Sequence, residues 1–327
     1  MIQCNDNTYI TRIHDVDYYL QDFLTIQSLI RLSEINKTMH NLVKNSTIYK
    51  QMNELKYKRK KLILCIEKGY FEMLKIYNRS ACIDLNKIDD LIICAAKTGQ
   101  LDILEYLIQS CGIEKTTDAI TDAIAYAMTY ASSSGHLPVV KYLVSMGGNI
   151  NTTGIQLSSL NGHLDVVKYF ISLGADPTAN DNIAIQWASK NGHLEVVKYL
   201  VSIGADIQAS DNSAVKLASE HGHLPVVKYL VQSGASVTGS NNYVVRIASA
   251  NGDLDMVKYL VSMQADIQAG YNSAILWASW YGHLDMVKYL VQSGASVTDN
   301  VVLWASARGH LNIAKYLLSV GAQNNVA

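Results

Sequence analysis

The stretch AVKLASEHGHLPVVKYLVQSG, residues 214 to 234, contains the pattern that decides the fold. Its first eight residues suit a short helix that ends before Gly222. Residues 224 to 233 suit a second helix, in which the only strongly polar or helix-opening side chains are Pro225, Lys228 and Gln232. These three positions form one narrow stripe of a helix, so we expect that stripe to face solvent and the other side chains to be buried.

Both ends of this helix pair carry signals of their own. Asp211, Asn212 and Ser213 precede the first helix and have side chains that commonly cap helix N-termini. Gly234 follows the second helix, where a left-handed residue is expected to end it. The same place in other copies is held by Gly174, Gly204, Gly294 and Gly321. Gln264 is the exception, which predicts a turn that is either strained or built differently.

The pattern recurs along most of the chain. The glycine between the two helices is found at Gly69, Gly99, Gly135, Gly162, Gly192, Gly222, Gly252, Gly282 and Gly309. These positions are 30, 36, 27, 30, 30, 30, 30 and 27 residues apart, a period typical of a solenoid of stacked helix-turn-helix units. The longest spacing contains residues 115 to 131, which predict an extended inner helix or an extra turn, and a bend of the stack there.

The composition is typical of a folded protein, and its net charge does not predict binding to nucleic acid. The chain has 327 residues, of which 49% are hydrophobic and 17% charged, and its formal net charge is -1. No apolar run reaches the roughly 18 to 20 residues of a membrane span, and the N-terminus lacks the layout of a signal peptide. We therefore expect a cytoplasmic location, or a nuclear one if the basic run KYKRKK at residues 56 to 61 is an import signal rather than a solvated linker.

The five cysteines predict neither a disulfide framework nor a structural zinc site. Their number is odd and no two of them form a C-x-x-C pair. Cys65 and Cys94 fall inside apolar helical stretches, where we expect them to act as small hydrophobic residues.

The repeated wording G-H-L-x-V-V-K-Y-L-V-x-x-G-A-D-I resembles the second half of the ankyrin repeat, and the match runs from residue 61 to about residue 325. The near-constant K-Y-L and the 30-residue period are similar to ankyrin arrays encoded by giant DNA viruses. The resemblance implies an all-α, ankyrin-type helical solenoid of about nine helix-turn-helix repeats in residues 61–327. It further implies a monomer that binds a protein partner on its concave face.

The copies depart from the family pattern in two ways. The usual T-P-L-H is replaced by IAIQ, SAVK, YVVR and SAIL at residues 183–186, 213–216, 243–246 and 273–276. About three residues of the common 33-residue unit are missing near Asp211 to Ser213, where the family has the tip of a β-hairpin finger. We therefore expect the fingers to be short or absent, so that recognition shifts to the concave face made by the inner helices.

Residues 1–60 do not share the period and are interpreted as a small helical N-terminal module. Their layout resembles the F-box, a three-helix module, at Phe23, Leu24, Leu29, Leu32, Ile35, Met39, Leu42 and Ile48, with Met39 in place of the usual tryptophan. The resemblance implies docking onto the Skp-type adaptor of a cullin-RING ubiquitin ligase, with the array holding the substrate. The alternative is a structural cap that covers the first repeat of the solenoid.

The two residues before each turn glycine vary, whereas the scaffold letters repeat. In ankyrin proteins these positions end the inner helix and commonly contact ligand, so the resemblance makes them the candidate partner-binding surface. The predicted binding residues are Trp280, Tyr281, Arg308, Asn251, His221, Lys190 and Asn191. Tryptophan, tyrosine and arginine are the types most enriched at binding hot spots. The alternative for Trp280 is that it packs against Trp304 or Tyr281 and fills space.

Three other tryptophans hold the position five residues before the turn glycine, which leucine or isoleucine occupies in other copies. We expect these side chains to belong to the core: Trp187, Trp277 and Trp304.

Histidines follow six of the turn glycines, at His136, His163, His193, His223, His283 and His310. Equivalent positions in stacked repeats are too far apart to share one metal ion, so we expect the ring nitrogens to bond to neighbouring backbone.

A column of seven lysines follows the outer helices, at Lys141, Lys168, Lys198, Lys228, Lys258, Lys288 and Lys315. Four of them follow an acid by three residues, at Asp165, Glu195, Asp255 and Asp285, which predicts exposed ion pairs on a solvated stripe. The alternative is a lysine ladder that attracts nucleic acid or an acidic partner, against which the balanced net charge argues.

No motif for catalysis is present. The chain lacks G-x-x-x-x-G-K-[ST], G-x-S-x-G and H-E-x-x-H. We therefore expect no enzyme activity, no catalytic residue, no metal and no cofactor.

Overall fold

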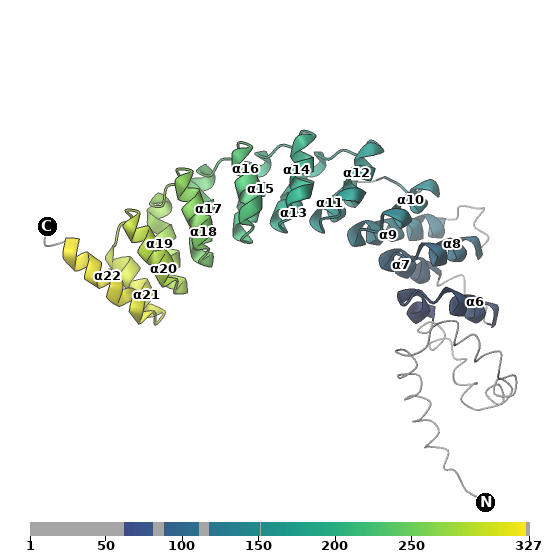
Figure 1. Cartoon of the computed structure of the whole chain (residues 1–327), viewed down its shortest axis with the longest axis horizontal. Coiled ribbons are helices and arrows are strands. Elements are labelled where there is room, and N and C mark those ends of the chain that lie inside the picture. Colours follow the sequence, from purple (N-terminus) through teal and green to yellow (C-terminus); the bar gives the residue numbers. More distant parts are fainter. Residues whose placement is uncertain (1–61, 81–87, 111–117, 151, 325–327) are drawn as a thin grey trace, which may run out of the picture.

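The computed structural model describes residues 62–80, 88–110, 118–150 and 152–324, and every regular element in these ranges is a helix. The helices form pairs that follow one another along an arc (Figure 1). The expected all-α solenoid is therefore confirmed for the described part of the chain. Residues 1–61, and with them every F-box-like position and the whole basic run, lie outside the described residues. No helix among the described residues is both long and apolar enough to cross a membrane.

Each of the nine described units has an inner helix followed by an outer helix. The inner helices are residues 62–67, α7 (Ile88–Thr98), α9 (Asp118–Ser134), α11 (Thr152–Leu160), α13 (Ala179–Lys190), α15 (Ala209–Glu220), α17 (Gly239–Asn251), α19 (Ala269–Tyr281) and α21 (Asp299–Ala307). The outer helices are α6 (Phe71–Ser80), α8 (Leu101–Ser110), α10 (Leu137–Ser145), α12 (Leu164–Ser172), α14 (Leu194–Ser202), α16 (Leu224–Gln232), α18 (Leu254–Ser262), α20 (Leu284–Gln292) and α22 (Leu311–Asn324). Helix α9 is 17 residues long, so the extended inner helix expected in the longest spacing is present.

Neighbouring inner helices pack more closely than neighbouring outer helices. Small side chains make this approach possible: Ala214, Ala218 and Ser219 of α15 are all buried. Because one row of helices is packed more tightly than the other, the array curves toward the inner row. The exposed side of the inner helices therefore forms the concave face.

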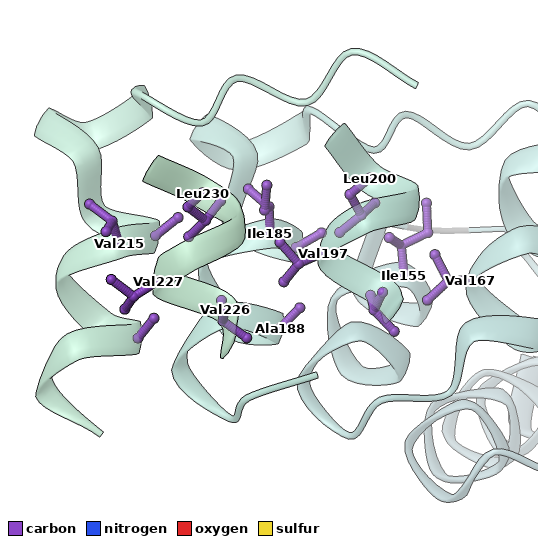
Figure 2. Packing of buried hydrophobic residues seen from close by; sticks show 14 of the residues in the cluster. Ile155, Val167, Ile185, Ala188, Val197, Leu200, Val215, Val226, Val227 and Leu230 are labelled. Atoms are coloured by element: carbon purple, nitrogen blue, oxygen red, sulfur yellow. The ribbon is translucent and has the colours of Figure 1, made fainter. Parts of the chain in front are cut away.

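The core runs between the two rows of helices and from unit to unit (Figure 2). In the unit that decides the fold, Val215 of the inner helix and Val226, Val227 and Leu230 of the outer helix are buried. Pro225, Lys228 and Gln232 are exposed, as the stripe in the sequence predicts. Burial of one such aliphatic side chain stabilises the fold by about 1.5–3 kcal/mol.

A histidine ties the turn inside one unit to the following unit. Gly192 has a φ of +78°, and a Cβ atom there would lie 2.5 Å from Nδ1 of His223. Glycine is needed for both reasons, because it adopts this backbone freely and leaves room for the ring.

The other ring nitrogen makes the backbone bond that the sequence predicts. The Nε2 atom lies 2.9–3.0 Å from a carbonyl oxygen of the preceding unit, on the residue two positions before that unit's turn glycine. As Nε2–H it donates a hydrogen bond to that oxygen. These pairs are His136 with Lys97, His163 with Ser133, His193 with Leu160, His283 with Ala250 and His310 with Trp280. The expectation is confirmed for these five histidines.

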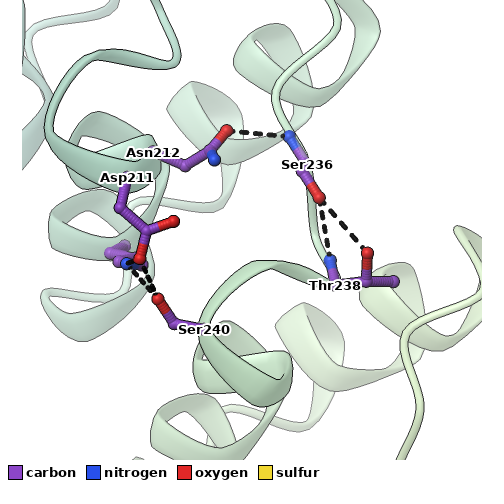
Figure 3. Close-up of polar contacts among 6 residues, drawn as sticks. Asp211, Asn212, Ser236, Thr238 and Ser240 are labelled. Atoms are coloured by element: carbon purple, nitrogen blue, oxygen red, sulfur yellow. Dashed lines mark hydrogen bonds and ion pairs between the residues drawn. The ribbon is translucent and has the colours of Figure 1, made fainter.

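The prediction that Asp211, Asn212 and Ser213 cap the N-terminus of the inner helix is wrong. Ser210, Asp211 and Asn212 are three consecutive left-handed residues, whereas a capping residue usually has an extended backbone. The left-handed turn directs Asn212 toward the next unit, where its Oδ1 accepts from the backbone N–H of Ser236 at 3.0 Å (Figure 3). Asn182 and Asn242 make the same bond, to the N–H groups of residues 206 and 266. Three-residue left-handed turns thus replace the fingers in the four units that begin with α13, α15, α17 and α19, and no strand occurs in the described ranges.

The left-handed ends of the outer helices are confirmed at Gly174, Gly204, Gly234 and Gly294. Gln264 has a φ of 67°, so its turn has the same backbone and is strained by the Cβ atom. The prediction for Gly321 is wrong, because α22 continues through this residue to Asn324. Glycine permits a left-handed backbone but does not impose one.

Only two of the four lysine–acid pairs form. Lys198 lies 2.8 Å from Glu195, and Lys288 lies 3.7 Å from Asp285. Lys168 instead lies over the Tyr199 ring of the next outer helix, and three more lysines of the column do the same: Lys141 over Tyr169, Lys228 over Tyr259 and Lys258 over Tyr289. The prediction considered one helix at a time, whereas stacking brings an aromatic ring within about 6 Å of these ammonium groups.

Candidate functional site

Four of the predicted binding residues lie at the ends of α13, α15 and α17. All four are exposed, but three of them also bond to backbone. Asn191 Nδ2 donates to the Leu160 carbonyl at 2.6 Å, and Asn251 Nδ2 donates to the Glu220 carbonyl at 2.7 Å. His221 Nδ1 lies 3.0 Å from the carbonyl oxygen of its own helix at residue 217. Lys190 has no such bond among the described residues, so it is the freest of the four.

The remaining three predicted binding residues lie toward the ends of α19 and α21, together with two tryptophans that were expected in the core. We call these five residues the aromatic cluster: Trp277, Trp280, Tyr281, Trp304 and Arg308. The Trp280 and Trp304 rings meet edge to face with centroids 5.2 Å apart. The Arg308 guanidinium carbon lies 4.5 Å from the centroid of the Trp280 ring, which is the geometry of a cation–π interaction. Trp277 stacks on Tyr281 with centroids 6.0 Å apart and meets Trp304 edge to face at the same distance.

The two neighbouring aromatic residues are presented differently. Trp280 is half-buried and packs against Trp304, as the space-filling alternative predicts. Tyr281 is 51% exposed, although one face of its ring is covered by Trp277. The ring also stacks on His283 with centroids 6.5 Å apart, so two neighbours hold it in place while the residue stays exposed. A rigid, exposed aromatic ring is a suitable contact for a partner.

The expectation that Trp187, Trp277 and Trp304 belong to the core is wrong, because all three are half-buried. Their position lies on the flank of the inner helix that turns toward the concave face, and Leu217 and Ile247 at the same position are also half-buried. Alanine and serine fill the space between inner helices, so no room is left there for an indole ring.

A pocket of about 190 Å³ opens between α17 and α19 beside the aromatic cluster. We call it the Arg246 pocket, and its lining is Tyr243, Arg246, Ile247, Ala250, Trp277 and Tyr281. Three of the first four residues were missed from the sequence, whereas Ala250 belongs to the variable pair before Gly252. All four lie on α17. Their spacing of three, one and three residues follows one face of a helix, and that pattern is the signal that identifies them.

The pocket combines apolar walls with one cation. Arg246 Nε is buried and has no hydrogen-bond partner. Burial raises the pKa of the Tyr243 hydroxyl, Glu220 raises it further, and Arg246 opposes both effects. Tyr243 is therefore protonated at neutral pH and is available as a hydrogen-bond donor.

No group of histidine, cysteine or acidic side chains among the described residues is arranged to hold a metal ion. The site offers aromatic surface, hydrogen-bond donors and a guanidinium. Such a set is suited to binding a polypeptide segment.

A comparison with family models matches the description "Ankyrin repeats (3 copies)" at residues 62–154, 91–181, 155–241, 217–301 and 245–327. No curated protein matches the chain, so the similarity to viral arrays stays a prediction. The overlapping matches together cover the helix pairs, the turn glycines and the concave face described above. The chain belongs to the ankyrin-repeat family.

Proposed function

We propose that this chain is a non-enzymatic scaffold that holds a protein partner on the concave face of its C-terminal units, with Tyr281 at the centre of the contact. Ankyrin repeats support a role in protein–protein interaction. The observation that supports this location is the exposed ring of Tyr281 beside the Arg246 pocket. Aromatic and arginine side chains next to a pocket are the groups that contribute most to binding.

The repeat itself does not require an aromatic residue at this position. The equivalent Asn191 and Asn251 donate hydrogen bonds to the preceding unit. At the unit of Tyr281 that function is absent, and the next tie is made by His310, whose ring bonds to the Trp280 carbonyl. Tyr281 therefore exposes aromatic surface at a position where other units use an asparagine tie, which favours a role in recognition.

A photo-crosslinking residue at position 281 of the full chain is the direct test. We expect it to link a protein partner that the same residue at position 232, on an outer helix, does not link. If both positions link the same proteins, or position 281 links none, the proposed site is wrong.

Tyr281→Ser is expected to weaken binding of that partner by about 2 kcal/mol, or roughly thirtyfold in Kd, because it removes the exposed ring. Titration calorimetry measures the change. Tyr271→Ser is the matched control, since Tyr271 is 95% exposed but lies in a left-handed turn outside the pocket lining. Equal losses in the two variants would contradict the location. Circular dichroism checks that helicity is retained in both.

We further propose that residues 1–60 recruit a Skp-type adaptor, so that the array presents its partner to a ubiquitin ligase. The support is the F-box-like pattern in the sequence, and the rival is a cap on the first repeat. Purified adaptor should bind the full chain and lose at least tenfold in affinity for a Phe23→Ser, Leu24→Ser variant. Binding that is absent, or equal for both chains, would favour the cap.

A further inference from the structure

The residue six positions before the turn glycine reaches the left-handed turn of the next unit in three successive inner helices. Gln186 Nε2 donates to the Asp181 carbonyl and to Ser210 Oγ. Lys216 Nζ pairs with Asp211 Oδ2 at 2.6 Å and also contacts Ser240 Oγ (Figure 3). In both units the side chain at this position is satisfied by polar groups of the protein itself.

Arg246 holds the same position in α17 and lacks both partners. Asn241 replaces the acid that pairs with Lys216, and Gly270 replaces Ser240. Among the described residues Arg246 forms no ion pair and no hydrogen bond, and its Nε is buried. A buried donor without a partner costs about 1–3 kcal/mol, which a bound acceptor recovers.

We propose that the Arg246 pocket binds an aspartate or glutamate side chain of the partner, followed by an apolar side chain on Trp277 and Tyr281. This inference rests on the proposed function and names the chemistry of its partner. The internal precedent is Asp211, whose carboxylate pairs with the cation at the same position of its own inner helix. Asn241 holds the place of that acid in α17, so the carboxylate of the partner reaches Arg246 from the pocket.

The local geometry is suited to a carboxylate. A Cβ atom on Gly270 would lie 3.3 Å from Cζ of Arg246, so the glycine leaves space beside the guanidinium. Arginine offers two parallel donors that match a carboxylate, and Tyr243 supplies a third donor from the same helix face. Glu220 raises the pKa of Tyr243 but forms no ion pair with Arg246. No acidic side chain of the described residues therefore competes with a ligand for the guanidinium.

The apolar part of the ligand has a defined place as well. Trp277 and Tyr281 are stacked on each other and line the pocket together with Ile247 and Ala250. An acidic side chain that reaches Arg246 therefore brings its neighbouring residue onto an aromatic surface. The selectivity expected from this arrangement is for an acid next to an apolar residue, not for acidity alone.

The test uses the full chain and a library of N-acetylated, C-amidated hexapeptides that contain aspartate, glutamate and phosphoserine. We expect the wild-type chain to select aspartate or glutamate beside an apolar residue. The best peptide and its glutamine-for-glutamate or asparagine-for-aspartate counterpart are then compared by fluorescence anisotropy. The wild-type chain should bind the acidic peptide about tenfold more tightly, as a charge-assisted hydrogen bond provides.

Two variants remove the preference without removing the pocket. Arg246→Gln copies Gln186, and Asn241→Asp copies Asp211, so both side chains already occur at these positions of the fold. Each should reduce the tenfold preference to less than twofold. Gln232→Glu is the control for the added charge, because it lies exposed on an outer helix, and it should retain the preference.

The outcomes separate this inference from the proposed function. No acid preference in the wild-type chain, selection of phosphoserine over carboxylates, or a preference that survives Arg246→Gln would each overturn the carboxylate site. If Arg246→Gln removes the preference while Tyr281→Ser binds every peptide normally, the central role of Tyr281 fails and the carboxylate site stands.

Discussion

Two successive joints of the array share a core design and differ in their polar ties. The first joint connects the α15–α16 unit to the α17–α18 unit, and the second connects α17–α18 to α19–α20. At the first joint Lys216 and Asp211, which are paired within their own unit, both contact Ser240 of the next unit. Asp253 replaces the bridging histidine there and caps α18 instead. At the second joint His283 bonds to the Ala250 carbonyl, whereas Arg246 is unpaired.

The difference shows which parts of the repeat are free to change. Val227 and Val257, one in each outer helix, are fully buried at equivalent places, and the asparagine bond to the next unit is present at both joints. A single polar tie contributes about 1 kcal/mol, while the buried side chains of one unit contribute several times more. Either tie is therefore dispensable, and the polar positions of the concave face can be used for recognition.

The largest effect is expected from a Cβ atom at the turn glycines. Gly252→Ala at the second joint should cost about 3 kcal/mol, because the Cβ atom would lie 2.6 Å from Nδ1 of His283 and the backbone is left-handed. Gly222→Ala at the first joint should cost only about 1–2 kcal/mol, since the nearest atom is Asp253 Oδ2 at 3.8 Å.

Guanidinium unfolding followed by circular dichroism measures both variants. Equal losses would show that backbone strain alone decides the cost and that the histidine ring moves aside freely.

A smaller effect is expected from the asparagine before the turn glycine. Asn251→Ala should cost about 1 kcal/mol, because its side chain is the hydrogen-bond donor described at the Glu220 carbonyl. Asn191→Ala should cost less than about 0.5 kcal/mol, since His193 also donates to the Leu160 carbonyl. The same unfolding measurement compares the two variants. A larger loss of stability for Asn191→Ala than for Asn251→Ala would show that the histidine bond does not compensate for the missing asparagine bond.

Part of the candidate site was predictable from the sequence. The variable pairs before the turn glycines pointed to Tyr281 and Arg308 at the concave face, because hot-spot residue types stood out from the repeat. Arg246 was not identified, since its significance depends on Asn241 of its own helix and Gly270 of the next unit, which only the folded structure brings together beside it. Trp277 was assigned to the core because its position is usually aliphatic, and only the packing shows that this position is half-buried.

The architecture of this protein follows from its repeated local pattern alone. A 30-residue period, an apolar pattern on two short helices and glycines at their ends leave few alternatives, because each is a local requirement repeated many times. The tertiary structure decided which polar groups are satisfied and which remain open. Lys216 and Arg246 hold the same place in the repeat. Lys216 pairs with Asp211 of its own unit, and both contact Ser240 of the next unit. Arg246 has asparagine and glycine at those two places and is unpaired.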